Sequence, residues 1–384
     1  MGAPIDLGAA REVFANSTEG TVGLEEEFAV LDPETLAMVP RFEELRDTAP
    51  PELRERITGE LIKSEIEIVS GRGADFRDAV ARQRDARRRL FAHAADAGVA
   101  LGATGTHAFA DYREQEFIDT EHYRRVAEGL QWVARRNNSF SLHVHVGING
   151  PDRAVRTCDR LRTVLPGLLA VSASSPFYDG MDSGLHSART QMFTRTFPRC
   201  GVPDAYGSWD AYADYIDFLV RSKSIVEYTQ VWWSVRPHFS FGTVEVRICD
   251  AQPTAQESEA TAALIAASIL QAARDVEEGR TEWETVPNRL IEENMWRAIR
   301  HGMDGRFVAP GTGEEREARA VLDDMLEWTA PARAEHGLGE PAFPDRNSAQ
   351  RQRALVAEGL SPAEVYAATV RETRATYAQE VPTA

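Results

Sequence analysis

Two histidines and several glutamates fall on stretches where apolar and polar residues alternate. In residues 140–148 (FSLHVHVGI), the even positions are all apolar, while His143 and His145 take odd positions. Successive side chains of a β-strand point to opposite faces, so both imidazoles share one face. A single strand histidine is usually a hydrogen-bonded structural residue, whereas two on one polar face indicate a metal or phosphate site.

Two further stretches, 22–28 (VGLEEEF) and 60–67 (ELIKSEIE), are rich in glutamate. Alternation places Glu25 and Glu27 on one face and directs Glu26 to the apolar side. Glu65 and Glu67 also share a face. Glutamate is disfavoured in strands, so its concentration there points to function, the alternative being solvated acids on edge strands.

Such a group of carboxylates predicts a bound cation. Ionised carboxylates brought together repel one another and raise each other's pKa values. Oxygen ligands with little sulfur favour Mg²⁺ or Mn²⁺. In residues 243–249 (TVEVRIC), Glu245 and Arg247 point to one face, and arginine supplies the forked donors that phosphate needs. An ion pair on a solvated face is the alternative, but together the stretches predict a magnesium–ATP site on a sheet.

These side chains require a sheet with one polar face. Strands are predicted at about 22–31, 61–69, 140–148 and 243–249. Helices are predicted over 74–97, ending at Gly98, and over 255–278, opening with Thr254 and Glu257 spaced as a capping box. Residues 309–317 are predicted to form a polar loop, and the chain from about 287 onward is predicted to be helical. The charged strand faces favour a mainly antiparallel sheet, with helices on one face and an active-site cleft on the other.

Composition excludes several classes of function. The 60 acidic and 43 basic residues give a net charge of -17, which disfavours nucleic acid or an anionic membrane as partner. Neither lysine, Lys63 or Lys223, follows a glycine, so a phosphate-binding P-loop is absent. Three scattered cysteines do not make a disulfide framework and indicate a reducing compartment. With no apolar run long enough to span a bilayer, a cytoplasmic protein is expected.

In chain order, the motifs resemble the bacterial carboxylate-amine ligases of the glutamate-cysteine ligase type 2 family. The resemblance rests on segments between about 20 and 330: 23–28, 60–67, 142–147, 182–189 (DSGLHSAR), 206–209 (YGSW), 233–238 (WSVRPH), 242–252 (GTVEVRICDAQ) and, more weakly, 293–302. It implies an α+β fold similar to glutamine synthetase catalytic domains and guanidino kinases, with an antiparallel sheet funnel backed by helices. One ligase domain over 1–384 is expected, with a core of about 20–330 and a helical part of about 287–378.

The resemblance also implies roles for individual residues. The metal-binding set it implies is Glu25, Glu27, Glu60, Glu67, His143 and Glu245. Alternation puts Glu60 on the face opposite Glu67, so either a bulge or a helix-to-strand junction intervenes or Glu65 is the ligand instead. Arg247 matches a phosphate-contacting arginine.

Three more residues have roles with open alternatives. Arg189 and Arg236 match positions that suit the carboxylate of the acid substrate, or else form structural salt bridges. His145 is assigned to ordering the ATP site or relaying a proton, or else it supports the residues that bind the metal without touching the metal itself. The family's second proline after Pro237 is replaced by His238, which changes the neighbouring pocket wall.

The implied reaction joins a glutamate-like carboxylate to a cysteine-like amine. ATP would phosphorylate the carboxylate, and the amine would attack the resulting acyl phosphate, with Arg247, Glu245 and His145 as catalytic residues. Many family members are only weakly active with glutamate and cysteine, so the physiological pair stays open, as does assembly into a homo-oligomer. The rivals are a guanidino or small-molecule kinase on the same fold, a metal-dependent hydrolase, and a ligand-binding protein without turnover.

Overall fold

The computed structural model describes residues 5–379, and within this range the chain forms one seven-stranded sheet with the order β10-β11-β5-β1-β3-β2 and β4 paired to β1. Each pair of neighbouring strands in it is antiparallel. The strands are β1 (Val22–Leu31), β2 (Ile57–Thr58), β3 (Glu65–Val69), β4 (Ala100–Gly102), β5 (Leu142–Gly147), β10 (Val235–His238) and β11 (Thr243–Val246). The predicted mainly antiparallel sheet is therefore confirmed.

The register of this sheet aligns its polar residues in rows. Glu25 of β1 lies opposite His143 of β5, and Glu245 of β11 lies opposite His145. On the other side of β1, Glu27 pairs with Glu67 of β3. Residues directly opposite each other in a ladder present their side chains on the same face, so segments more than 200 residues apart share one surface.

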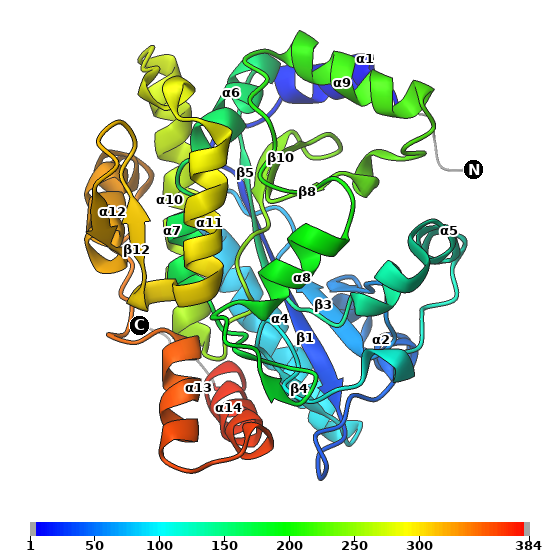
Figure 1. The fold of residues 1–384 in the computed structure, drawn as a ribbon. Coiled ribbons are helices and arrows are strands. Elements are labelled where there is room, and N and C mark those ends of the chain that lie inside the picture. Colours follow the sequence, from blue (N-terminus) through cyan, green and yellow to red (C-terminus); the bar gives the residue numbers. More distant parts are fainter. Residues whose placement is uncertain (1–4, 380–384) are drawn as a thin grey trace.

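Helices pack on the opposite face of the sheet, where the apolar residues of the alternating pattern are buried (Figure 1). Against β1 and β5 lie α4 (Phe76–Asp96) and α10 (Ala255–Glu277), with α6 (Pro151–Leu161) and α7 (Leu165–Ser172) beside them. Glu26 points to this side, where its carboxylate accepts hydrogen bonds from Ser258 and from Gln83, the latter at 2.7 Å. The predicted opposite orientation of Glu26 is confirmed.

Other helices surround this core. They are α1 (Leu7–Ala15), α2 (Phe42–Thr48), α3 (Pro51–Arg54), α5 (Glu121–Leu130), α8 (Ala188–Thr196), α9 (Trp209–Arg221), α11 (Asn288–His301), α12 (Ala318–His336), α13 (Ser348–Ala357) and α14 (Pro362–Tyr377). Short 3₁₀ turns span η1 (Tyr112–Glu114), η2 (Gln131–Arg136), η3 (Tyr228–Gln230), η4 (Glu282–Thr285) and η5 (Gly302–Asp304). Small ladders join β6 (Phe177–Tyr178) to β7 (Met181–Asp182), β8 (Cys200–Gly201) to β9 (Trp232–Trp233), and β12 (Arg306–Val308) to β13 (Glu315–Glu317).

Both predicted helices are confirmed, with one difference in capping. Gly98 follows α4 with φ +72°, the left-handed conformation that glycine adopts easily at a helix end. The hydroxyl of Thr254 accepts from the N–H of Glu257 at 3.1 Å, as predicted. The Glu257 carboxylate, however, accepts from the Thr254 hydroxyl and from Arg351, and so the reciprocal half of the capping box is replaced by an ion pair.

Three boundaries were predicted wrongly. The strand predicted over 243–249 ends at Val246, so Arg247 lies just beyond it. Residues 309–317 are not entirely loop, because Glu315–Glu317 pairs with Arg306–Val308 in a hairpin between helices. The strand predicted over 61–69 begins only at Glu65, and Glu60 lies in the loop between β2 and β3. Strand alternation therefore does not apply to Glu60, and neither a bulge nor a helix junction is needed to turn it toward Glu67. Among residues 5–379, no helix combines the length and apolarity that crossing a membrane requires.

Candidate active site

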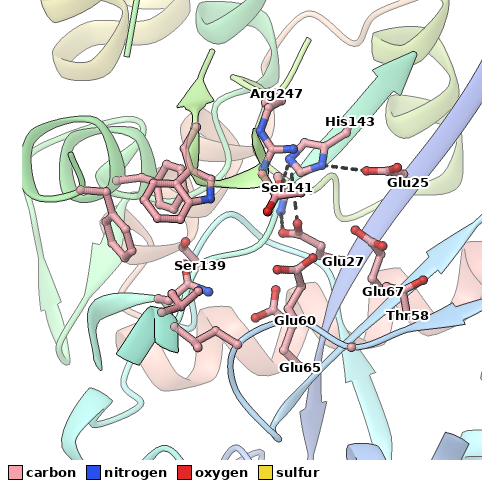
Figure 2. A pocket seen from close by; sticks show the side chains of 18 of the residues that line it. Glu25, Glu27, Thr58, Glu60, Glu65, Glu67, Ser139, Ser141, His143 and Arg247 are labelled. Atoms are coloured by element: carbon pink, nitrogen blue, oxygen red, sulfur yellow. Dashed lines mark hydrogen bonds and ion pairs between the residues drawn. The ribbon is translucent and has the colours of Figure 1, made fainter. Parts of the chain in front are cut away.

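A cavity of about 330 Å³ opens over the polar face of the sheet, and all ten residues predicted for the site line it. They are Glu25, Glu27, Glu60, Glu67, His143, His145, Arg189, Arg236, Glu245 and Arg247. Glu65 lines the cavity as well. Figure 2 shows four of the glutamates pointing toward one shared space, with His143 and Arg247 at its edge. Sequence reasoning thus identified the cavity, although it could not place each side chain within it.

Among the described residues, three groups of side chains have ligand atoms within 4.8 Å of one another: Glu25 with Glu67 and His143, Glu25 with His145 and Glu245, and Glu27 with Glu60 and Glu67. Because Glu25 and Glu67 each belong to two groups, the groups overlap and could hold neighbouring cations. His145 belongs to one of them, a position that the sequence analysis had not assigned to a metal. Glu65 belongs to none.

The glutamates on and near β3 have too few positive charges beside them to balance their own. Burial, together with repulsion from Glu27, raises the pKa of Glu60 to about 8. Burial and neighbouring carboxylates likewise raise the pKa values of Glu65 and Glu67 well above their usual range. One carboxylate oxygen of Glu65 is buried without a hydrogen-bond partner. A bound divalent cation would relieve this repulsion, so the donor set fits Mg²⁺ or Mn²⁺.

His143 is hydrogen-bonded through both ring nitrogens, and His145 through one. His143 lies with Nδ1 3.1 Å from a Glu25 oxygen and Nε2 2.7 Å from the hydroxyl of Ser141. Nδ1 of His145 lies 3.0 Å from the Thr243 hydroxyl, and Nε2 lies 3.1 Å from Glu25. Such contacts set the orientation that a ligating imidazole presents.

The electrostatic surroundings of these two imidazoles differ. Burial lowers the pKa of His143, and Arg247 lowers it further. For His145 burial also acts to lower the pKa, but Glu25 and Glu245 outweigh it and raise the value. Burial opposes the charge of Glu25, yet the two histidines hold the pKa of its carboxyl well below its usual range. The sheet therefore pairs an anion-rich end near β3 with a charge-balanced end near β11.

Glu245 lies at the charge-balanced end, between two arginines. It is fully buried, and Arg236 donates to its carboxylate from Nε at 2.6 Å and from a second nitrogen at 3.3 Å. Arg247 also donates to Glu245. Although burial opposes ionisation, the two guanidinium groups keep the pKa of Glu245 well below its usual range. Of the two roles left open for Arg236, the structure contains the salt bridge, while the same side chain still lines the cavity.

Arg189 is fixed from behind by the chain that follows β11. Its guanidinium donates to the carbonyl oxygens of Ile248 at 3.1 Å and Arg247 at 3.3 Å, and lies 3.6 Å from the buried Asp250. Its Nε is buried and has no hydrogen-bond partner. This leaves Arg189 one donor that no protein group uses.

An aromatic wall completes the cavity and was missed by the sequence analysis. Phe193 and Phe197 stack at 4.6 Å, and Phe197 meets Trp232 edge-on at 6.2 Å. The spacing of four between the phenylalanines on a helix could have signalled a shared face. His238, the residue that replaces proline, also lines the cavity, and its ring stacks on exposed Phe241 at 4.3 Å.

Comparison with known proteins gives one consistent family. Residues 21–379 match the model of "Glutamate-cysteine ligase family 2(GCS2)". A Rubrobacter xylanophilus protein provisionally named glutamate–cysteine ligase 2-2 is 38% identical over 97% of this chain and 98% of its own length. The glutamate–cysteine ligase of Francisella tularensis in complex with AMP has a similar fold at 11% identity (TM-score 0.68, 94% of this chain and 90% of that chain). A bifunctional glutathione synthetase from Pasteurella multocida also has a similar fold at 15% identity (TM-score 0.65, 96% of this chain and 53% of that chain).

Proposed function

The chain belongs to the glutamate-cysteine ligase family 2 and is an ATP-dependent ligase that forms an amide bond; we propose that it does so through an acyl phosphate on a small carboxylic acid. The observation that carries this mechanism is the convergence of three overlapping groups of metal-ligand atoms with Arg247 in a single cavity. Activation of a carboxylate by phosphoryl transfer depends on positioning and on neutralising the charge of the triphosphate.

The glutamate cluster is the proposed magnesium site. Glu27, Glu60 and Glu67 present oxygen atoms to one point, and their mutual repulsion makes a divalent cation favourable there. Glu25 and His143 extend the set, while Ser141 keeps the imidazole oriented. When bound, Mg²⁺ supplies neutralisation of phosphate charge and alignment of the transferring group.

Arg247 is proposed to contact the transferring phosphoryl group. Its guanidinium lines the cavity beside Glu245, which holds it in place and raises its pKa against the effect of burial. His145, whose raised pKa comes from Glu25 and Glu245, is proposed to order the ATP site as a ligand or to move the proton released by the amine.

The substrate carboxylate is proposed to meet Arg189 and Arg236. Arg189 pairs with Asp250 at 3.6 Å but keeps an unpartnered Nε, whereas Arg236 is bound to Glu245 through two nitrogens. Arg189 is therefore the stronger candidate for direct binding, and Arg236 for holding Glu245. A glutamate-like acid and a cysteine-like amine are the proposed substrate classes.

Hydroxylamine provides the test. As a small nucleophile it captures an acyl phosphate and yields a hydroxamate, with ADP and phosphate in equal amounts. The enzyme is incubated with ATP, Mg²⁺, hydroxylamine and a panel of amino acids and simple carboxylates. Arg247→Gln is expected to lower hydroxamate formation by about 100-fold or more. Arg124→Gln is the matched control because Arg124 is exposed on α5, pairs with Asp119 and does not line the cavity.

Each rival mechanism leaves a different product. Release of AMP and pyrophosphate would show that the acid is activated as an adenylate and not as an acyl phosphate. A stable phosphorylated substrate without hydroxamate would indicate a kinase, and phosphate release that needs no acid would indicate a hydrolase. If ATP binds but no acid in the panel causes turnover, the chain is a binding protein.

A further inference from the structure

A second hollow of about 510 Å³ adjoins the reaction cavity. Val126, Gln230 and Trp232 line both, so the two spaces are neighbours. The hollow is bordered by α5, by the turn before β8 and by the segment that follows α9, which Figure 1 labels. None of the glutamates in the three metal-ligand groups lines it.

The charge of this hollow is opposite to that of the protein. Arg125, Arg199 and Lys223 line it, against one carboxylate, Glu128, in a chain of net charge -17. Within residues 5–379 none of these three cations forms an ion pair, whereas Arg124, next in sequence, pairs with Asp119 at 2.9 Å. The Nε of Arg125 is also buried without a hydrogen-bond partner. Unpaired cations around one space are suited to bind an anion.

Arg199 is held rigidly at the boundary with the reaction cavity. Its Nε donates to the carbonyl of Gln230 at 3.0 Å, and its own carbonyl accepts from the N–H of Trp232 at 3.0 Å. Its guanidinium carbon lies 5.7 Å from the centre of the Trp232 ring. Burial lowers the pKa of Arg199, because no carboxylate beside it compensates the loss of water. A pre-positioned guanidinium loses little entropy when it binds an anion.

We propose that this hollow binds the anionic end of the acceptor amine, so that the enzyme's amine substrate carries a carboxylate remote from the attacking nitrogen. The inference rests on the proposed ligase mechanism and specifies its second substrate. The phosphates of ATP would be bound by the cations that the glutamates hold and by Arg247, and the acid substrate is proposed to meet Arg189. The amine is the remaining substrate, and Trp232, which lines both spaces, marks where it would pass from the reaction cavity into the hollow. The volume of the hollow suits an amine that extends beyond a cysteine-like end, such as a dipeptide whose first residue supplies the attacking nitrogen.

Matched acceptors test this assignment. Amino acids and dipeptides are each compared with their own C-terminal amide, which keeps the shape and removes the charge. For the native enzyme, kcat/KM is expected to favour the free acid by about tenfold or more, the usual effect of a charge-assisted contact. The triple variant Arg125→Gln/Arg199→Gln/Lys223→Gln should reduce this preference to about threefold or less. Hydroxamate formation with hydroxylamine, which has no carboxylate for the three cations to bind, should change less than about threefold.

Two further measurements guard against a folding defect. Arg124→Gln, on the same helix but outside the hollow, should keep the full preference for free acids. In the native enzyme, added KCl should lower kcat/KM for free acids and leave that for amides unchanged. If the triple variant unfolds, this salt dependence and the single variants Arg125→Gln and Lys223→Gln decide the question.

The possible failures are distinct. If the native enzyme forms hydroxamate but uses free acids and amides equally, or accepts no carboxylate-bearing amine, the assignment of the hollow is overturned. It is also overturned if the folded triple variant keeps the preference for free acids. Absence of hydroxamate with every acid would overturn the ligase mechanism itself, and the assignment with it.

Discussion

Without metal, the protein should lose stability as the pH rises from about 5 to about 8, and Glu60→Gln should reduce that loss. The pKa of Glu60 is raised from 4.5 to about 8 by burial and by the charge of Glu27. Between these two values the folded state binds a proton that the unfolded state has released, so stability falls with rising pH. Below pH 4.5 both states are protonated and the penalty vanishes.

The size of the effect follows from the two pKa values. At about 1.4 kcal/mol for each pH unit between them, ionising Glu60 costs up to about 5 kcal/mol. Glu60 is only partly buried, and solvent screening reduces this to about 2 kcal/mol. For a chain of 384 residues, an unfolding entropy of about 0.8 kcal/mol per degree converts this to a shift of about 2 to 3 °C in Tm.

The assay is a thermal melt in chelator at pH 5 and at pH 8.5. Glu60→Gln should match the native protein at pH 5 and exceed its Tm by about 2 to 3 °C at pH 8.5. Added Mg²⁺ should raise the Tm of the native protein more than that of the variant, because metal binding uses the ionised carboxylate. Glu55→Gln, which removes an equally negative but exposed side chain, controls for the net charge. A Tm difference between Glu60→Gln and native protein that does not depend on pH would refute the reasoning.

Further substitutions separate the two faces of the sheet and the supports of the site. Glu25→Gln should lower activity by about 100-fold or more, whereas Glu26→Gln should keep kcat and lower the free energy of unfolding by about 1 to 2 kcal/mol, as activity assays and melts would show. Ser141→Ala removes the hydroxyl 2.7 Å from His143 and should raise the Mg²⁺ concentration for half-maximal activity by about 10- to 100-fold in a magnesium titration. Glu245→Gln leaves the buried Arg236 and the half-buried Arg247 without their anion and should lower both turnover and stability, the latter by about 3 kcal/mol in denaturant unfolding. Unchanged activity in Glu25→Gln, or unchanged stability in Glu245→Gln, would contradict these assignments.

Within the strands, periodicity alone assigned side chains to the correct face of the sheet, although it did not fix where each strand begins and ends. Alternation with a period of two is a property of the strand backbone, so it separated Glu26 from Glu25 and Glu27 without knowledge of any neighbour. Helix capping is equally local: the Thr254 side chain caps the start of α10, and Gly98 follows the end of α4, as expected. The resemblance to a known family then connected glutamates, histidines and arginines that lie far apart in the chain, a step that no local pattern could make.

Only the tertiary structure decided which charges meet. Glu60 faces Glu67 because a loop, which has no fixed period, carries it. Arg236 lies against Glu245 because the register of two strands sets it there. Likewise, Arg125 and Arg199 border one hollow because distant segments fold together around it. Burial and pairing between distant side chains depend on the packing of the whole chain, and therefore the order of residues determined the chemistry available while the fold determined where it is concentrated.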